Sequence, residues 1–425
     1  MKTHIGVYIF LFYVLTLPAA AEPLPVAEPE AVGMSSQRLE RIGQTLRADI
    51  DKGRMPGAVV AIARKGKLLY YQAFGFLDKA AGIPMRKDAI FSIASMTKPM
   101  TSVATMLLVE EGRLFITDPV GAYLPALGNM PVAVMKTDAS GQTVVDTVPA
   151  KRVMTIQDLM RHTSGLTYGD RGTTAVHQMY PASSASAPRD YTGAEFIEKL
   201  GTLPLLHHPG TVWEYSFSTD VLGLLVEAVT KQSLGQFLDT RVFKPLAMID
   251  TGFIVPAEKR SRYAKALPND PDTGNPQSMI NLTKKPTKFE CGGACAVSTV
   301  ADYLRFAQAL LNRGKLGSAQ ILGRKSVELM VADHLGPEIQ NNVEKTDPTR
   351  AGFGFGLGFA VRRAPGISGI LGSPGDISWG GGMGTYFWVD SKEELVVVFM
   401  AHTPGPTRLH YRKVINALVL QALVG

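Results

Sequence analysis

The sequence predicts an α/β fold of the α+β type, in which one antiparallel sheet is assembled from both ends of the chain and flanked by helices. Two patterns support this prediction. Near the start, an apolar stretch at residues 58–63, a polar turn at 64–67 and a second stretch at 68–75 are typical of an antiparallel hairpin. Near the end, residues 384–389 and 394–400 repeat this pattern around another polar turn. We therefore expect the two hairpins to share one sheet.

Each hairpin is accompanied by a predicted helix. Behind the possible N-cap residues Ser35 and Ser36, apolar side chains recur at helical spacing, namely Leu39, Ile42, Leu46 and Ile50. After the second hairpin, residues 408–423 form a final amphipathic pattern. An amphipathic helix needs an apolar surface to cover, and the predicted sheet supplies one.

The middle of the chain differs from both ends. Helical stretches such as 154–161 and 222–229 alternate there with long loops that contain Pro and Gly. Residues 168–192 and 256–290 are polar, turn-rich and weakly periodic, and we expect them to be loops that shape a cleft. The middle is thus predicted to be an inserted, mainly helical domain.

These patterns predict how the domains are divided. We expect an α/β domain with the antiparallel sheet from residues 30–98 and 290–425, and the mainly helical domain from residues 99–289. The active site is expected in the cleft between them.

The first 21 residues have the pattern of a secretory signal peptide. Lys2 precedes an apolar run at residues 5–17, and Pro18 with three alanines precedes Glu22. The alternative is a single membrane anchor, but about thirteen apolar residues are fewer than the roughly 20 that a spanning helix needs. We predict a periplasmic or secreted protein with no stable membrane insertion after the signal is removed.

Composition is typical of a globular protein without a nucleic-acid partner. The chain has 425 residues, of which 45% are hydrophobic, and its net charge of +7 is spread out and not clustered with aromatic residues. The oligomeric state cannot be derived from the sequence. Whether Cys291 and Cys295 form a disulfide also stays open, because such a short loop closes only if a turn brings the Cα atoms within about 7 Å.

A candidate nucleophile stands where a helix is predicted to begin. Ser95 and Lys98 are three residues apart before the helical pattern of residues 100–111, so they can share one face. A serine hydroxyl needs a base to remove its proton, and a buried lysine can serve because burial favours its neutral form. Alone, the Ser-x-x-Lys pattern is weak, since Ser95 could be only a cap residue.

Two further motifs strengthen the assignment. Tyr215 stands at a loop-to-helix entry, where a phenol can project into a cleft, although it could also be a half-buried aromatic with its hydroxyl in water. Gly380, Gly381 and Gly382 follow Trp379 beside a strand, where glycine lets the backbone approach a ligand; a simple bulge or turn is the alternative.

Together, the Ser95 to Lys98, Tyr215 to Phe217 and Trp379 to Gly381 motifs resemble the class C beta-lactamase-like serine hydrolases, specifically the family VIII carboxylesterases. The resemblance spans roughly residues 30–422, with the motifs in the family's order. It implies a beta-lactamase/transpeptidase-like fold and no metal or other cofactor. In agreement, the histidines include no His-Glu-x-x-His pattern, and His162 is expected to be a hydrogen-bonded structural residue.

The resemblance also implies residue roles. Ser95 would be acylated, and Lys98 and Tyr215 would share the general base and acid roles. The backbone N–H groups of Ser95 and Gly382 would form the oxyanion hole.

Departures from the family pattern bear on the substrate. Beta-lactamases and peptidases of this superfamily usually have Asn where Phe217 stands and Lys where Trp379 stands. We expect Phe217, Trp379, Gly380 and Gly381 to contact the substrate. Since neither a phenyl ring nor an indole can replace the missing Asn and Lys, the motifs favour uncharged acyl groups.

We therefore expect a carboxylesterase that cleaves a small-molecule, short-chain ester. Beta-lactamase or D-amino-acid peptidase or amidase activity is the first alternative. A non-catalytic relative that binds cell-wall peptides or another protein is the second.

Overall fold

The structure is a computed structural model that describes residues 24–137, 143–277 and 287–425. The predicted signal peptide lies outside these described residues. Within them, no helix combines the length and the apolar composition needed to cross a membrane.

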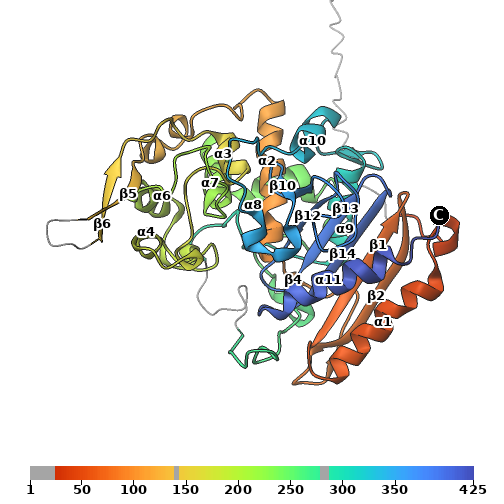
Figure 1. The fold of residues 1–425 in the computed structure, drawn as a ribbon. Coiled ribbons are helices and arrows are strands. Elements are labelled where there is room, and N and C mark those ends of the chain that lie inside the picture. Colours follow the sequence, from red (N-terminus) through yellow and green to blue (C-terminus); the bar gives the residue numbers. More distant parts are fainter. Residues whose placement is uncertain (1–23, 138–142, 278–286) are drawn as a thin grey trace, which may run out of the picture.

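Eight strands in the described part of the chain form one antiparallel sheet. Its order is β10-β11-β12-β13-β14-β1-β2-β3, so strands from the two ends of the chain lie side by side (Figure 1). The strands are β1 (Gly57–Arg64), β2 (Lys67–Asp78), β3 (Ile83–Pro84), β10 (Phe353–Phe355), β11 (Ala360–Arg362), β12 (Ile377–Gly380), β13 (Tyr386–Asp390) and β14 (Leu395–Ala401).

Both predicted hairpins are confirmed and are joined through β1. Strand β1 pairs with β2 on one edge and with β14 on the other, where Ala58 lies opposite Ala401. Strands β13 and β14 form the second hairpin, with Tyr386 opposite Phe399. The sheet is therefore assembled from both ends of the chain, as the sequence predicts.

Helices cover both faces of this sheet. Helices α1 (Ser36–Asp51) and α11 (Thr407–Leu420) pack on the face that carries Val60 and Ile62 of β1. Helix α9 (Val300–Leu311) packs on the opposite face, with Val59. The Ser35 side chain accepts a hydrogen bond from the Arg38 N–H, which confirms the predicted N-cap of α1.

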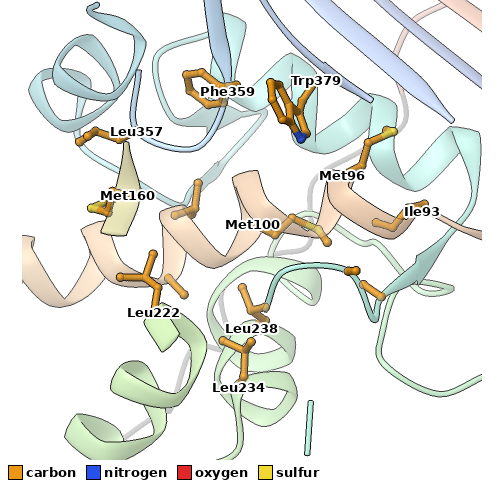
Figure 2. Close-up of a cluster of buried hydrophobic side chains, with 14 of the residues drawn as sticks. Ile93, Met96, Met100, Met160, Leu222, Leu234, Leu238, Leu357, Phe359 and Trp379 are labelled. Carbon is orange, nitrogen blue, oxygen red and sulfur yellow. The ribbon is translucent and has the colours of Figure 1, made fainter. Parts of the chain in front are cut away.

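The helical part of the molecule lies beside the sheet and is organised around α2 (Figure 1). Figure 2 shows Met100 of α2 between Leu222 and Leu238 on one side and Trp379 on the other, all within one buried apolar cluster. The remaining helices are α2 (Thr97–Glu110), α3 (Ile156–Met160), α4 (Ala175–Met179), α5 (Ala187–Asp190), α6 (Gly193–Gly201), α7 (Ser218–Thr230), α8 (Leu234–Leu238) and α10 (Arg324–Val331).

The middle of the chain is less purely helical than predicted. Strands β5 (Val132–Thr137) and β6 (Thr143–Val148) form a separate hairpin that extends away from the main sheet (Figure 1). Their valine-rich and threonine-rich composition favours extended backbone. The stretch 168–192, which we expected to be loop, contains the short helices α4 and α5. The Thr174 side chain caps α4, and Pro188 in the first turn favours α5. The remaining short strands are β4 (Phe91–Ser92), β7 (Val297–Ser298), β8 (Lys315–Leu316) and β9 (Ala319–Gln320).

Candidate active site

Ser95 lies in a single 3-10 turn, Ala94–Met96, directly before α2. Ala94 has a φ of 44°, a left-handed conformation that is unusual for a residue with a Cβ atom. The Thr97 hydroxyl donates a 2.7 Å hydrogen bond to the Ala94 carbonyl and stabilises this turn. As a result, Ser95 is only half-buried and lines a cavity of about 430 Å³.

Lys98 lies beneath this cavity in the first turn of α2, and only 1% of its surface is exposed. Its Nζ donates a 2.7 Å hydrogen bond to the Gly293 carbonyl and a longer one, 3.4 Å, to the Tyr168 hydroxyl. The same Nζ lies 4.5 Å from the centre of the Tyr215 ring. The lysine predicted as a base is therefore buried and in direct contact with the predicted tyrosine.

A chain of hydroxyl groups connects Lys98 to a buried carboxylate. The Tyr168 and Ser184 hydroxyls are hydrogen-bonded at 2.7 Å, and Ser184 donates to Asp220 Oδ2 at 2.6 Å. Asp220 also accepts from the Gly293 N–H at 3.0 Å. Burial raises the pKa of Asp220, and the charge of Lys98 opposes that rise. This network connects the Lys98 Nζ to a buried carboxyl group through two hydroxyl groups.

The loop that holds the Lys98 acceptor is closed by a disulfide. Cys291 and Cys295 are bonded, with their Cα atoms 5.2 Å apart. This settles the question that the sequence left open. Gly293 lies inside the loop, so the disulfide constrains the carbonyl that contacts Lys98.

Tyr215 stands just before α7, in a group of aromatic rings. Its ring centre lies 4.9 Å from that of His162 and 5.5 Å from that of Trp379. Its hydroxyl is buried and has no hydrogen-bond partner among the described residues. A buried hydroxyl without a partner costs stability, so this one is available to a group that enters the cavity, which Tyr215 also lines.

The glycines after β12 bring the backbone close to Ser95. A Cβ atom on Gly381 would lie 2.3 Å from the carbonyl oxygen of Ile93, so a larger residue would push the two segments apart. The N–H of Gly381 donates to the Thr385 carbonyl. The N–H of Gly382, by contrast, has no hydrogen-bond partner in the part of the chain that the structure describes.

The structure brings most of the predicted site residues together. Ser95, Tyr215, Trp379, Gly380 and Gly382 line the cavity, and Lys98 lies directly below. Among the described residues, the Ser95 hydroxyl forms no hydrogen bond to Lys98 or Tyr215. Catalytic hydrogen bonds are often long in a free enzyme and shorten when substrate binds.

Two predicted substrate contacts require correction. Phe217 is fully buried and does not line the cavity. Its ring centre lies 4.5 Å from that of Tyr168 and 5.1 Å from that of Phe196. Gly381 is likewise occupied by backbone packing and does not line the cavity. Phe217 supports Tyr168, and it is Tyr168 that reaches both the cavity and Lys98.

Sequence reasoning missed three polar contributors. Tyr168, Ser184 and Asp220 form a hydrogen-bonded chain that begins at Lys98, but consecutive members are 16 and 36 positions apart in sequence. No spacing rule connects them to Ser95. Asp220 could have been noticed only as an acidic residue in the first turn of α7, directly before its apolar run.

His162 is buried, with its ring centre 5.8 Å from that of Trp213 and its Nδ1 3.4 Å from the Ser216 hydroxyl. Burial lowers the pKa of His162 well below its usual value, and the charge of Lys98 acts in the same direction. Its place behind Tyr215 agrees with the predicted structural role. Within the described ranges, no three His, Cys, Asp or Glu side chains are grouped closely enough to hold a metal ion.

An antiparallel sheet built from both chain ends, a helical body beside it and a serine one turn before a buried lysine define a serine hydrolase of the Ser-x-x-Lys class. The beta-lactamase family model matches residues 42–421, and the chain belongs to the beta-lactamase family.

Named relatives of this chain include esterases. It is 36% identical over 365 residues to Protein Rv1367c of Mycobacterium tuberculosis, with 85% of this chain and 89% of that protein covered. It is 30% identical over 404 residues to Esterase EstB of Burkholderia gladioli, with 92% and 98% covered. Among solved structures, EstCE1, described as a hydrolase with promiscuous acyltransferase activity, matches with a TM-score of 0.70 at 25% identity, covering 90% of this chain and 98% of that one.

Proposed function

We propose that this protein cleaves short-chain carboxylic esters through an acyl-enzyme formed on Ser95. One observation carries the proposal. Ser95, the unpartnered Tyr215 hydroxyl and the unpartnered Gly382 N–H meet at one cavity, directly above the buried Lys98. The esterase names of the relatives support the choice of substrate class.

In the first half of the reaction, Ser95 Oγ attacks the ester carbonyl carbon and its proton passes to the Lys98–Tyr215 pair. The carbonyl oxygen becomes negative and accepts hydrogen bonds from the N–H groups of Ser95 and Gly382. The bond to the alcohol oxygen then breaks. The departing alkoxide takes the proton from the pair, which leaves Ser95 acylated and releases a neutral alcohol.

The second half repeats these steps with water. Water attacks the acyl carbon while the pair accepts one of its protons, and the bond to Ser95 Oγ breaks as Oγ takes that proton back. The carboxylic acid leaves and the free enzyme returns. The Lys98 Nζ lies 4.5 Å from the centre of the Tyr215 ring, so the two groups are neighbours at the cavity.

Initial rates on p-nitrophenyl acetate and butyrate test the proposal. Ser95→Ala is expected to lower kcat by about three orders of magnitude or more, because nucleophile and base act as a unit. Ser102→Ala is the matched control, since Ser102 is a buried serine of α2, the helix that follows Ser95, and does not line the cavity. If Ser95→Ala keeps most of the wild-type rate, the proposal is wrong.

The same assay separates the alternatives. Faster turnover of nitrocefin or D-alanyl peptides than of esters would favour the lactamase or peptidase alternative. A folded protein with no turnover of any of these substrates would favour a binding function.

We also propose that the chain is exported and that its first 21 residues are removed. The disulfide between Cys291 and Cys295 supports this location, because disulfides persist in oxidising compartments. N-terminal sequencing of the protein from its native host should find a start near Glu22. A mature protein that still begins at Met1 would contradict the proposal.

A further inference from the structure

One side of the cavity at Ser95 is rich in arginine. Arg350, Arg408 and Arg412 line it next to Trp379 and Gly382, and we call these three residues the arginine wall. Arg408 and Arg412 belong to α11, whereas Arg350 comes from the turn before β10. Residues from separate parts of the chain thus bring positive charge to one side of the same cavity.

Few negative charges accompany the arginine wall. In the described part of the chain, Asp347 is the one carboxylate within ion-pair distance of any of the three, at 3.0 Å from Arg412 Nη1. The charges of Arg350 and Arg412 hold the pKa of Asp347 at about 2, against the effect of its burial, so it is ionised at neutral pH. Asp347 is therefore the one described carboxylate in direct contact with any of these three cations, and Asp270 acts on Arg408 only from a longer distance. The other cavity arginine, Arg171, has a carboxylate of its own, Glu214, at 3.8 Å.

Hydrogen-bond donors of the arginine wall are also left without partners. Arg350 Nη2 and Arg412 Nε are buried and have no hydrogen-bond partner among the described residues. Arg350 donates to the Thr346 hydroxyl at 3.2 Å, and Arg412 to the Gly381 carbonyl at 3.1 Å. A buried donor without an acceptor is costly, and a charged one more so, which makes these groups candidates for a ligand acceptor.

Arg350 also changes how the Trp379 motif should be interpreted. From the sequence, tryptophan at this position removes a cation and favours uncharged substrates. In the structure, the Arg350 guanidinium lies 3.7 Å from the centre of the Trp379 ring. Burial lowers the pKa of Arg350 to about 10, so the group is still charged at neutral pH. A positive charge is therefore present beside Trp379 after all.

We infer that the preferred ester carries a carboxylate, which the arginine wall binds while Ser95 attacks the ester carbonyl. The inference rests on the proposed ester cleavage at Ser95 and deepens it by naming the substrate class. A carboxylate has two oxygens that match the paired donors of a guanidinium, so arginine is well suited to hold it. It would also balance the excess positive charge.

Two matched pairs of esters test this inference. In the first pair the charge is on the acyl side: mono-4-nitrophenyl glutarate against 4-nitrophenyl methyl glutarate. In the second it is on the alcohol side: 4-acetoxybenzoate against methyl 4-acetoxybenzoate. We expect kcat/KM to be about tenfold higher or more for the charged member of one pair, which is the size of a single charge-assisted contact. The pair in which the charged ester is preferred shows whether the carboxylate belongs to the acyl side or the alcohol side of the substrate.

The preference should also weaken with salt, because part of the attraction to a half-exposed arginine such as Arg408 is screened. If kcat/KM for the methyl ester equals kcat/KM for the acid in both pairs, the carboxylate inference is overturned while ester cleavage stands. If none of the four esters is cleaved, or Ser95→Ala cleaves them as fast as wild type, the proposed function itself fails.

Variants on α11 connect the preference to the arginine wall. Arg408 has no carboxylate within ion-pair distance among the described residues. Arg408→Gln is expected to lower the charged-to-neutral ratio of kcat/KM at least fivefold, mainly through KM. Arg408→Lys should restore much of the ratio. Lys413→Gln is the matched control, because it removes a charge from the same helix at a residue that lines a separate hollow, with Gly366 and Gly372.

Equal effects of Arg408→Gln and Lys413→Gln would show a general influence of net charge and would overturn the inference. Arg408 also donates to the carbonyls of Pro404 and Gly405, so the melting temperature of each variant is measured first. If Arg408→Gln does not fold, the comparison of the two ester pairs in the wild-type protein decides the question alone.

Discussion

The two sides of the cavity at Ser95 balance their charges differently. On one side, Lys98 is enclosed by the Gly293 carbonyl, the Tyr168 hydroxyl and, through Ser184, the Asp220 carboxylate. On the other side, the arginine wall has only Asp347 within ion-pair distance in the described chain. The Lys98 Nζ has acceptors within the protein, whereas Arg350 Nη2 and Arg412 Nε have no acceptor among the described residues.

This difference assigns separate tasks to the two sides. A cation whose neighbours are all fixed is held in one position, which is what a proton-transfer group needs. Cations with unused donors are suited to bind a group that arrives from solution. Substitutions on the Lys98 side should therefore act on kcat, and those on the arginine wall mainly on KM.

The largest effect is expected from Lys98→Met. Methionine fills a similar volume but cannot accept a proton, so ester kcat should fall by about three orders of magnitude. Lys87→Met is the control, because the Lys87 Nζ also lies over a tyrosine ring, 5.4 Å from the centre of Tyr71, but not at the cavity. A near-normal kcat of the Lys98→Met enzyme would contradict a role of Lys98 in proton transfer.

Tyr215→Phe should have the next largest effect. The ring and its packing against His162 and Trp379 remain, and only the unpartnered hydroxyl is lost. We expect ester kcat to fall by about two orders of magnitude, as for the loss of a general acid–base group. Tyr180→Phe removes a buried hydroxyl that donates to the Pro204 carbonyl instead, and it should leave kcat unchanged. Equal kcat values for the two variants would contradict the role of Tyr215.

The third prediction concerns how the stability of the protein depends on pH through the buried His402. His402 is buried, with Nε2 accepting from the Ser92 N–H at 2.9 Å and Nδ1 donating to the Ala264 carbonyl at 2.7 Å. Burial lowers its pKa from 6.5 to about 4. The unfolded chain therefore binds a proton at pH 5 that the folded protein does not, and stability falls as pH drops below 6.5.

From these values, His402 accounts for about 2 kcal/mol of the stability lost between pH 7 and pH 5. The amide of His402→Gln can donate and accept but does not titrate. We measure the free energy of unfolding by urea at pH 7 and at pH 5. The decrease from pH 7 to pH 5 should be smaller in the variant than in the wild type by about that amount. If the free energy of unfolding decreases between pH 7 and pH 5 by the same amount in the variant and the wild type, His402 is not a source of acid sensitivity.

The smallest effect is expected from Asp220→Asn, which tests whether the negative charge of the Lys98 network matters. Asp220 acts through Lys98 and is a positioning residue. Because Asp220 and Lys98 interact electrostatically, replacing the carboxyl group with a neutral amide should move the pH–rate profile. We expect kcat to fall by roughly tenfold because Lys98 is held less firmly. A change in kcat with no movement of the profile would indicate a purely structural role.

Local patterns were sufficient to predict the sheet and the central residues of the site. The hairpins around β1 and β14 are visible as alternating apolar stretches bounded by polar turns, and α1 has a clear cap at Ser35. Ser95, Lys98 and Tyr215 lie in short motifs whose order matches the family. These features depend on neighbours in sequence, so the sequence reveals them.

What could not be predicted depends on distant parts of the chain. Phe217 was expected at the cavity because of its place in a motif, but helix packing buries it behind Tyr168. Arg350 reaches Trp379 from a turn about 30 residues away in sequence, and no periodicity indicates that contact. The sequence motifs therefore did not reveal the arginine beside Trp379, since one motif position was taken to represent the whole surface.

The order of strands has a consequence for synthesis of the protein. Strand β1 is made early, but its partner β14 is made only near the end of translation. Until then, one edge of β1 has unsatisfied backbone groups, and Ser95 lacks the β12 turn that carries Gly382. A growing chain is thus open to wrong strand pairing until β14 has been made.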